Sequence, residues 1–145
     1  MTRIIKSAIV IGFVILGTNI VEAKDKDLFQ AAASGDLRMV RFFLEIGADV
    51  NAKNKDGKTA PMVALERGYI EVVKLLLDKG AYVNAKNKDG KTALLVASNL
   101  EVVKLLLDKG ADVNVKDKNG VTALREASWR SDNEMVNLLK AYGAK

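Results

Sequence analysis

Two short strings in this chain carry the residue types that bind phosphate. Gly57-Lys58-Thr59 and Gly90-Lys91-Thr92 both match the end of a phosphate-binding P-loop. A P-loop also needs a glycine five residues before its second glycine, so that the backbone can bend around the phosphate. Those two positions hold Ala52 and Ala85. The strings are therefore interpreted as turns that lead into helices.

A calcium-binding loop is matched more closely near the C-terminal end of the sequence. Asp117, Asn119, Gly120 and Glu126 occupy the third, fifth, sixth and twelfth positions of such a loop. The first position is Val115, whose side chain offers no oxygen to a metal. The equivalent segments upstream end on valine instead of glutamate. No metal site is therefore expected.

The residue counts exclude several other kinds of site. The chain of 145 residues has no cysteine and no histidine, which removes disulfides, thiolate nucleophiles, the usual zinc sites and imidazole bases. The sequence offers no acid and base that would meet in a cleft, so neither enzymatic activity nor a cofactor is expected. A hydrophobic content of 49% and a charged content of 28% are typical of one ordinary globular domain.

The N-terminal residues have the pattern of an export signal. Arg3 and Lys6 precede an apolar stretch over residues 8–16, and residues 21–23 match a signal-peptidase site. We therefore predict a signal peptide over residues 1–23 and a location that is periplasmic or secreted. The apolar stretch is shorter than the ~20 residues of a membrane-spanning helix, so no membrane span is expected after cleavage.

A repeat with a period of 33 residues runs through the rest of the chain. The first unit lacks the opening turn, and its residues Phe29 to Asn51 carry only the helix pair. Each later unit opens with a turn-like string and closes with a second, apolar string that ends in Gly-Ala. Such nearly literal repetition indicates a stack of similar structural units. The strings are KNKDGKTA at 53–60 and 86–93, KDKNGVTA at 116–123, EVVKLLLDKGA at 71–81 and 101–111, and EMVNLLKAYGA at 134–144.

With these strings the sequence resembles the ankyrin-repeat family, from about Asp27 to Ala144. The resemblance implies an all-α fold, a solenoid of stacked helix-turn-helix units joined by β-hairpin-like loops. It also implies a monomer that binds another protein through the hairpin tips and the concave face of the first helices. The domain would cover residues 24–145, with repeats at about 24–53, 54–86, 87–116 and 117–145.

Local signals for two helices recur in each unit. Thr59, Thr92 and Thr122 stand where a hydroxyl can accept a hydrogen bond from a free amide at the start of a helix. The second helix is apolar on two sides, so it needs a neighbour on each flank. The end units differ, because one flank of each meets water: Lys140 replaces a leucine in the last unit, and Phe42-Phe43 is assigned to the core of the first.

The sequence departs from the family pattern in two ways. The family's histidine is replaced by Met62, Leu95 and Arg125, which removes the hydrogen bonds that it makes between neighbouring turns. The third repeat also lacks three residues around Ser98-Asn99. Since a helical turn takes about 3.6 residues, the first helix of that repeat is expected to be one turn shorter.

Charged residues recur with the repeat, which is typical of structural positions. Asp56, Asp89 and Asp117 are interpreted as turn-forming residues of the hairpins. On the second helices, lysines and aspartates four residues apart are expected to form solvent-exposed pairs. These pairs are Lys74 with Asp78 and Lys104 with Asp108.

Lysines at the hairpin tips are the main candidate for a binding surface. Stacked repeats would set them side by side at about 8–10 Å, as either an ordinary solvated surface or a positive edge that steers an acidic partner. Trp129 replaces Glu66 of the second repeat and is either an exposed anchor for the partner or an aromatic lid on the terminal repeat. The candidate partner-binding residues are Lys55, Asp56, Lys58, Glu66, Arg67, Lys88, Asp89, Lys91, Lys118, Trp129 and Arg130.

Two functions are consistent with these features. The first is a non-catalytic protein-interaction module outside the cytoplasm. The second is an envelope-associated protein that binds anionic polymers or lipid headgroups through its lysines. The formal net charge of +5 favours an acidic partner but is too small to indicate nucleic-acid binding.

Overall fold

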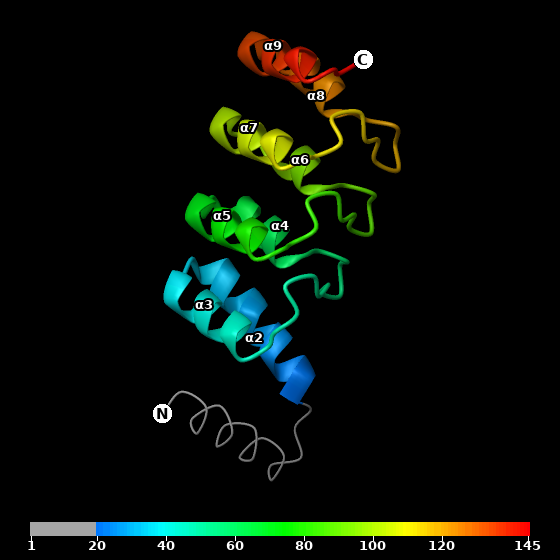
Figure 1. The fold of residues 1–145 in the computed structure, drawn as a ribbon. Coiled ribbons are helices and arrows are strands. Elements are labelled where there is room, and N and C mark those ends of the chain that lie inside the picture. Colours follow the sequence, from blue (N-terminus) through cyan, green and yellow to red (C-terminus); the bar gives the residue numbers. More distant parts are fainter. Residues whose placement is uncertain (1–19) are drawn as a thin grey trace.

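The computed structural model describes residues 20–145, so most of the predicted signal peptide lies outside the described residues. This part of the chain folds into eight α-helices and contains no strand, which confirms the predicted all-α class. The helices form pairs that stack along one axis, with a loop projecting between successive pairs (Figure 1). The pairs are α2 (Ile20–Ser34) with α3 (Leu37–Glu45), α4 (Ala60–Arg67) with α5 (Ile70–Asp78), α6 (Ala93–Val96) with α7 (Leu100–Asp108), and α8 (Ala123–Trp129) with α9 (Asn133–Ala141).

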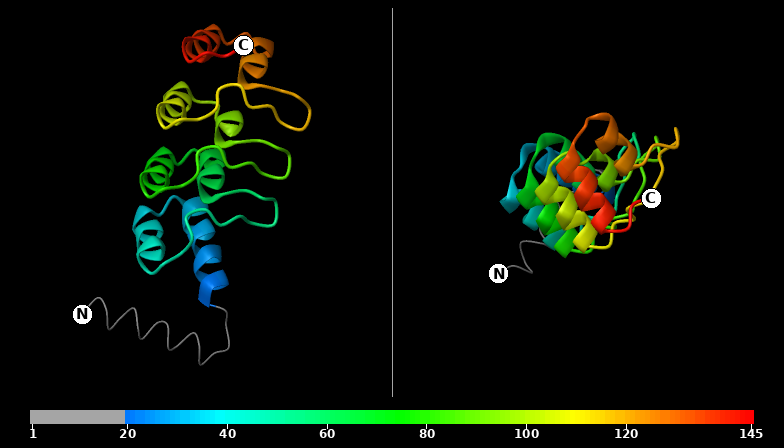
Figure 2. Two further views of the ribbon diagram at one scale, coloured as in Figure 1. Left: turned by 45° about the vertical axis from the view of Figure 1, so that its right-hand side comes forward. Right: turned by 90° about the horizontal axis from the view of Figure 1, so that it is seen from above.

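The first and second helices of the pairs form two columns. Figure 2 shows α2, α4, α6 and α8 above one another beside the projecting loops, and α3, α5, α7 and α9 in the outer column. The second helices bury residues on two sides, as predicted: in α5, Val72, Val73, Leu75, Leu76 and Leu77 are all buried. The hydrophobic core is therefore continuous from one repeat to the next.

The predicted core of the first repeat is only partly correct. Phe42 and Phe43 pack edge to face with their ring centroids 5.4 Å apart. Both side chains are half-buried, and only Phe43 packs against the main core. Phe42 lies outside that core. Within residues 20–145, α3 lies at the end of the stack and no further helix pair covers its outer flank.

An asparagine side chain ties each repeat to the next. Asn84 accepts a hydrogen bond from the Asp112 amide at 2.7 Å and donates one to the Gly110 carbonyl at 3.1 Å. The side-chain amide suits this role because it carries both a donor and an acceptor. Asn51 and Asn114 make the same pair of bonds in the other repeats.

At the N-terminal end, charged side chains of α2 take the place of this asparagine. Asp25 accepts a hydrogen bond from the Asp49 amide at 2.8 Å, and the Lys24 ammonium donates to the Ile46 carbonyl at 3.0 Å. The residues that directly follow the predicted cleavage position thus hold the loop after α3.

The third repeat is shortened where the sequence predicts it. Its first helix, α6, has four residues, whereas α4 has eight. Asn99 then caps α7, its side-chain oxygen accepting a hydrogen bond from the Glu101 amide at 2.8 Å. The predicted loss of about one turn is confirmed.

The threonines before the first helices behave less uniformly than predicted. Thr122 caps α8 by accepting a hydrogen bond from the Arg125 amide at 3.2 Å. Thr59 and Thr92 occupy the capping position but make no such bond. The capping prediction is wrong for these two because their side chains are buried instead of standing over the free amides.

Thr92→Val is expected to raise the free energy of unfolding by about 1 kcal/mol. The Thr92 hydroxyl is buried and has no hydrogen-bond partner in the described part of the chain. A buried hydroxyl without a partner is destabilising, whereas valine has the same shape and no polar group. Denaturant midpoints measure the change. Thr122→Val is the control and should lower stability, because it removes a capping bond that is made.

Left-handed glycines follow several of the helices, among them Gly80 after α5 and Gly110 after α7, whose φ angles are 93° and 90°. At the end of α8 this position holds Ser131, with a φ of 56°. The left-handed conformation is strained for a residue that carries a Cβ atom.

Ser131→Gly is expected to stabilise the fourth repeat by up to about 1 kcal/mol. The change relieves ~1–2 kcal/mol of strain and costs about 0.5–1 kcal/mol of extra chain entropy. The thermal midpoint measures the gain. Gly68→Ser, at the equivalent end of α4, is the reverse control, since Gly68 has a φ of 79° and open space around it. If both substitutions raise the thermal midpoint, the backbone of Ser131 is not strained.

The second helices carry charge pairs different from those predicted. Lys74 contacts Glu71 at 3.0 Å and Glu101 of the next repeat at 3.5 Å, and Asp78 pairs with Lys109 at 2.9 Å. The prediction of Lys74–Asp78 and Lys104–Asp108 pairs is wrong. Lys74 pairs instead with Glu71, three residues earlier on the same helix, and with Glu101 of the next repeat. Asp108 accepts a hydrogen bond from the Tyr142 hydroxyl.

Candidate functional site

Each loop between helix pairs is a tight turn held by one side chain. In the first, the Asn54 side-chain oxygen accepts hydrogen bonds from the amides of Asp56 and Lys58 at 2.9 and 3.0 Å. Asn87 and Asp117 make the same two bonds in the next two loops. These loops are called hairpins below, although no strand is assigned in the described residues. The two strings that resemble P-loops thus form turns before α4 and α6.

The aspartates of the hairpins do not share one role. Asp117 holds its turn, as predicted, because it is aligned with Asn54 and Asn87 in the repeat. Asp56 and Asp89 stand two residues later, where their side chains are exposed at the tips. Asp56 and Asp89 still lie within their turns, as predicted, but it is the preceding asparagine and not the aspartate that holds each turn.

Backbone hydrogen bonds join the tips of neighbouring hairpins. The Lys88 amide donates to the Asp56 carbonyl at 3.1 Å, and the Lys118 amide donates to the Asp89 carbonyl at 2.9 Å. The hairpins are packed closely, since a Cβ atom on Gly57 would lie 3.0 Å from the Lys88 nitrogen. This packing holds three exposed lysines in one row, called the lysine edge: Lys55, Lys88 and Lys118.

Two of the candidate residues are paired with each other. The Lys58 ammonium lies 2.8 Å from a Glu66 carboxylate oxygen, and this hydrogen-bonded contact raises the pKa of Lys58. The third repeat has no such pair, because its shortened first helix lacks the position that Glu66 occupies, although Lys91 is present. In the fourth repeat the two positions hold Val121 and Trp129.

Trp129 is an exposed aromatic residue at the end of α8. The side chain is 63% exposed, which is the anchor-like arrangement of the two that the sequence left open. The guanidinium of Arg125 lies 5.0 Å from the centre of the indole ring, within the range of a cation–π contact. Arg125 was not among the candidate residues. Its spacing of four positions from Trp129 on one helix is the signal that predicts the contact.

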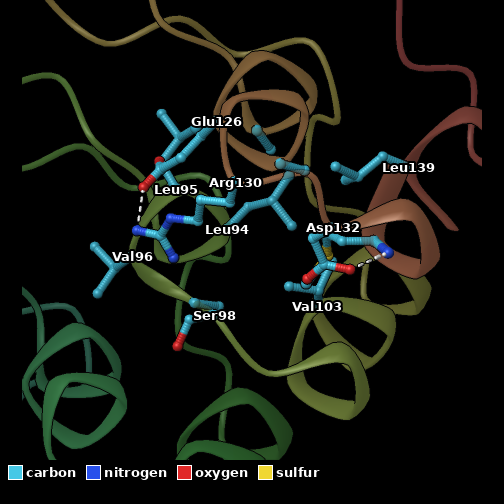
Figure 3. Close-up of a pocket in the computed structure, with 13 residues that line it drawn as sticks. Leu94, Leu95, Val96, Ser98, Val103, Glu126, Arg130, Asp132 and Leu139 are labelled. Carbon is cyan, nitrogen blue, oxygen red and sulfur yellow. Dashed lines mark hydrogen bonds and ion pairs between the residues drawn. The ribbon is translucent and has the colours of Figure 1, made fainter. Parts of the chain in front are cut away.

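Arg130 lies on a different side of α8 from the indole. Its guanidinium pairs with Glu126 at 2.6 Å and lines a small pocket between α6 and α8 (Figure 3). The structure thus separates Arg130 from Trp129, although the two are adjacent in sequence. Arg67, the equivalent residue of α4, is exposed.

The pocket of Figure 3 results from the shortened third repeat. Val96, the last residue of α6, and Ser98 line it, and so do Met135 and Leu139 of α9. Its volume of about 60 Å³ has room for a few water molecules. Typical sites for small molecules start at about 300 Å³. We therefore assign this pocket to the packing of the third and fourth repeats.

Within residues 20–145, no cluster of three or more carboxylate, cysteine or histidine side chains is placed to hold a metal ion. No helix of that part is long and apolar enough to cross a membrane. Among the exposed features of the described residues are the lysine edge at the hairpin tips and the indole of Trp129, and both are suited to binding a partner.

The similarity to known families covers most of the helix pairs. A family model described as ankyrin repeats, in three copies, matches residues 28–117. No curated protein matches the chain significantly. Beyond the matched residues, α8 and α9 form a further pair with the same stacking. Ankyrin repeats imply protein–protein interaction, and proteins built from them are typically non-catalytic. Since the match spans more than half of its length, this chain belongs to the ankyrin-repeat family.

Proposed function

We propose that this chain is a protein-interaction module that acts outside the cytoplasm, after removal of residues 1–23, as a monomer. It binds an acidic protein through the lysine edge and the adjoining side of the first helices. One observation carries the proposal: the hairpins are joined tip to tip, which keeps Lys55, Lys88 and Lys118 exposed in one row. The pattern of residues 1–23 supports the location.

The electrostatics of the hairpins favour an acidic partner. Segments 53–58 and 86–91 each carry three lysines and one aspartate, and segment 116–121 carries two lysines and one aspartate. Neighbouring hairpins are in contact, so their charges act together within a screening length of about 8 Å at physiological salt. Charges of this kind raise the association rate more than the affinity.

Site-specific cross-linking tests the proposed surface. A photoreactive residue replaces Lys88 at the hairpin tips or, as the control, Lys104 on the outer column, where the side chain is also exposed. Irradiation in the native host is expected to join one discrete protein to position 88 and not to position 104. The same adduct from both positions would contradict a specific surface at the hairpins.

Reversing the lysine edge is expected to slow association with that cross-linked partner, once it is isolated, by about tenfold or more at low salt. The variant combines Lys55→Glu, Lys88→Glu and Lys118→Glu. Its association rate should also depend less on salt, because long-range attraction is lost. Stopped-flow or surface-binding kinetics over a salt series measure both effects.

The control for this variant changes the same charge on the opposite side of the molecule. Lys79→Glu, Lys104→Glu and Lys140→Glu replace three exposed lysines of the outer column and its loops. If both triple variants slow association equally, net charge and not the lysine edge controls the encounter.

The same lysines also suit anionic polymers or lipid headgroups, which is the second candidate function. It predicts that vesicles containing phosphatidylglycerol bind the wild-type chain and release it as salt rises, and that cross-linking at position 88 captures no protein. Sedimentation with vesicles separates the two functions.

A further inference from the structure

The last repeat carries a groove on the side of α8 that faces away from the third repeat. Its volume is about 390 Å³, within the range of ligand-binding sites. The pocket between α6 and α8 is lined by Ala123, Glu126, Ala127 and Arg130 of α8. At about 3.6 residues per turn these four residues share one side of the helix, and the residues of α8 that line the groove lie on the other side. The residues of α8 that line the groove are Leu124, Arg125, Ser128 and Trp129.

The groove combines two apolar side chains, Leu124 and Trp129, with positive charge. Lys116 from the last hairpin, Arg125 from α8 and Lys145 from the C-terminal segment line it, and no acidic side chain of the described residues does. Asn114 holds the Lys145 backbone in place, accepting a hydrogen bond from its amide at 2.9 Å. Three cationic residues therefore line the same groove as the exposed indole of Trp129, and the guanidinium of Arg125 lies 5.0 Å from the centre of its ring.

We propose that this end groove binds an acidic segment of a protein partner. Carboxylates of the segment pair with Lys116, Arg125 and Lys145, and an apolar side chain beside them covers the indole of Trp129. The inference rests on the proposed function only in that the partner is a protein. The groove adjoins the C-terminal end of the lysine edge, because Lys116 and Gly120 belong to the hairpin that carries Lys118, but none of the three lysines of the edge lines it.

The charges decide between the occupants that would fit this shape. A purely apolar segment would cover the cations without compensating them, which is costly. A second copy of the chain, joined groove to groove, would bring two sets of cations together. An acidic segment with one apolar residue satisfies both the cations and the indole.

The fluorescence of Trp129 provides a direct test, because the chain has a single tryptophan. The probe is an acetylated and amidated synthetic peptide of sequence Glu-Leu-Glu-Phe-Glu-Glu, titrated into the full chain. We expect a saturable change in emission that weakens as salt rises. The same peptide with glutamine in place of each glutamate should bind far more weakly. Equal binding of the two peptides, or no change in emission with either, would overturn the inference.

Matched variants locate the bound peptide. Lys116→Gln combined with Lys145→Gln is expected to weaken binding by roughly threefold to tenfold, as for the loss of two exposed ion pairs. Lys55→Gln combined with Lys88→Gln changes the same charge on the lysine edge and should leave binding unchanged. The opposite pattern would place the peptide on the lysine edge, which overturns the inference and leaves the proposed function intact.

Two further outcomes separate this inference from the functions proposed above. Peptide binding in the groove, together with no adduct from a photoreactive residue at position 88, would contradict the proposed lysine-edge function alone. Phosphatidylglycerol vesicles that shift the Trp129 emission, together with an inactive acidic peptide, would overturn the inference in favour of a lipid surface.

Discussion

Leu76→Ala is expected to lower the free energy of unfolding by about 2–5 kcal/mol. Leu76 lies in α5, is 0% exposed and belongs to the core shared by successive repeats. Truncation removes apolar contacts and leaves a cavity that neighbouring helices fill only in part. Since a small domain is stable by only ~5–15 kcal/mol, the loss is a large share of the total.

Urea denaturation followed by helical circular dichroism measures this effect. Lys104→Ala is the matched control, because Lys104 lies on α7, in the same outer column, with an exposed side chain. The Lys104 variant should keep the wild-type midpoint. Equal midpoints for the two variants would show that the buried and exposed faces of the second helices are wrongly assigned.

The stacking of the repeats could be predicted from the sequence, because the repeat period indicates both the buried sides of the second helices and the place where a unit is shortened. The apolar stripes of residues 71–81 and 101–111 identify the buried sides of α5 and α7, and both are confirmed. The shortening of α6 also follows, since a deletion of three residues matches one helical turn.

Contacts between repeats were harder to predict. The link from Asn84 to Gly110 and Asp112 depends on which backbone groups of the next repeat come within reach, and sequence spacing does not show this. The pair of Lys74 with Asp78 is wrong for two reasons: Glu71 lies three residues before Lys74 on the same helix and contacts it at 3.0 Å, and Glu101 approaches from a neighbouring helix.

The candidate binding residues were predicted by type and position, but not by what each side chain contacts. The pairing of Lys58 with Glu66 and the turn of Arg130 toward Glu126 both depend on side-chain conformation. Among the candidate lysines, the structure shows Lys55, Lys88 and Lys118 exposed, and Lys58 and Lys91 partly buried. Whether these residues bind a partner stays a prediction.

Trp129→Ala is expected to speed dissociation of the partner by about 30-fold or more, the effect of losing an aromatic anchor worth ~2 kcal/mol at an interface. The melting temperature should hardly change, because the indole is 63% exposed and its clear internal contact is with Arg125. Tyr82→Ala is the control, since Tyr82 is 70% exposed but lies in the loop after α5. It should alter neither quantity.

Two measurements on the Trp129 variant distinguish an anchor from a lid. Dissociation kinetics with the partner isolated by cross-linking report on the interface, and thermal unfolding of the free chain reports on the fourth repeat. Faster dissociation at an unchanged melting temperature assigns the indole to binding. If the melting temperature falls while dissociation stays the same, Trp129 stabilises the end of the stack, and the partner contacts the lysine edge without it.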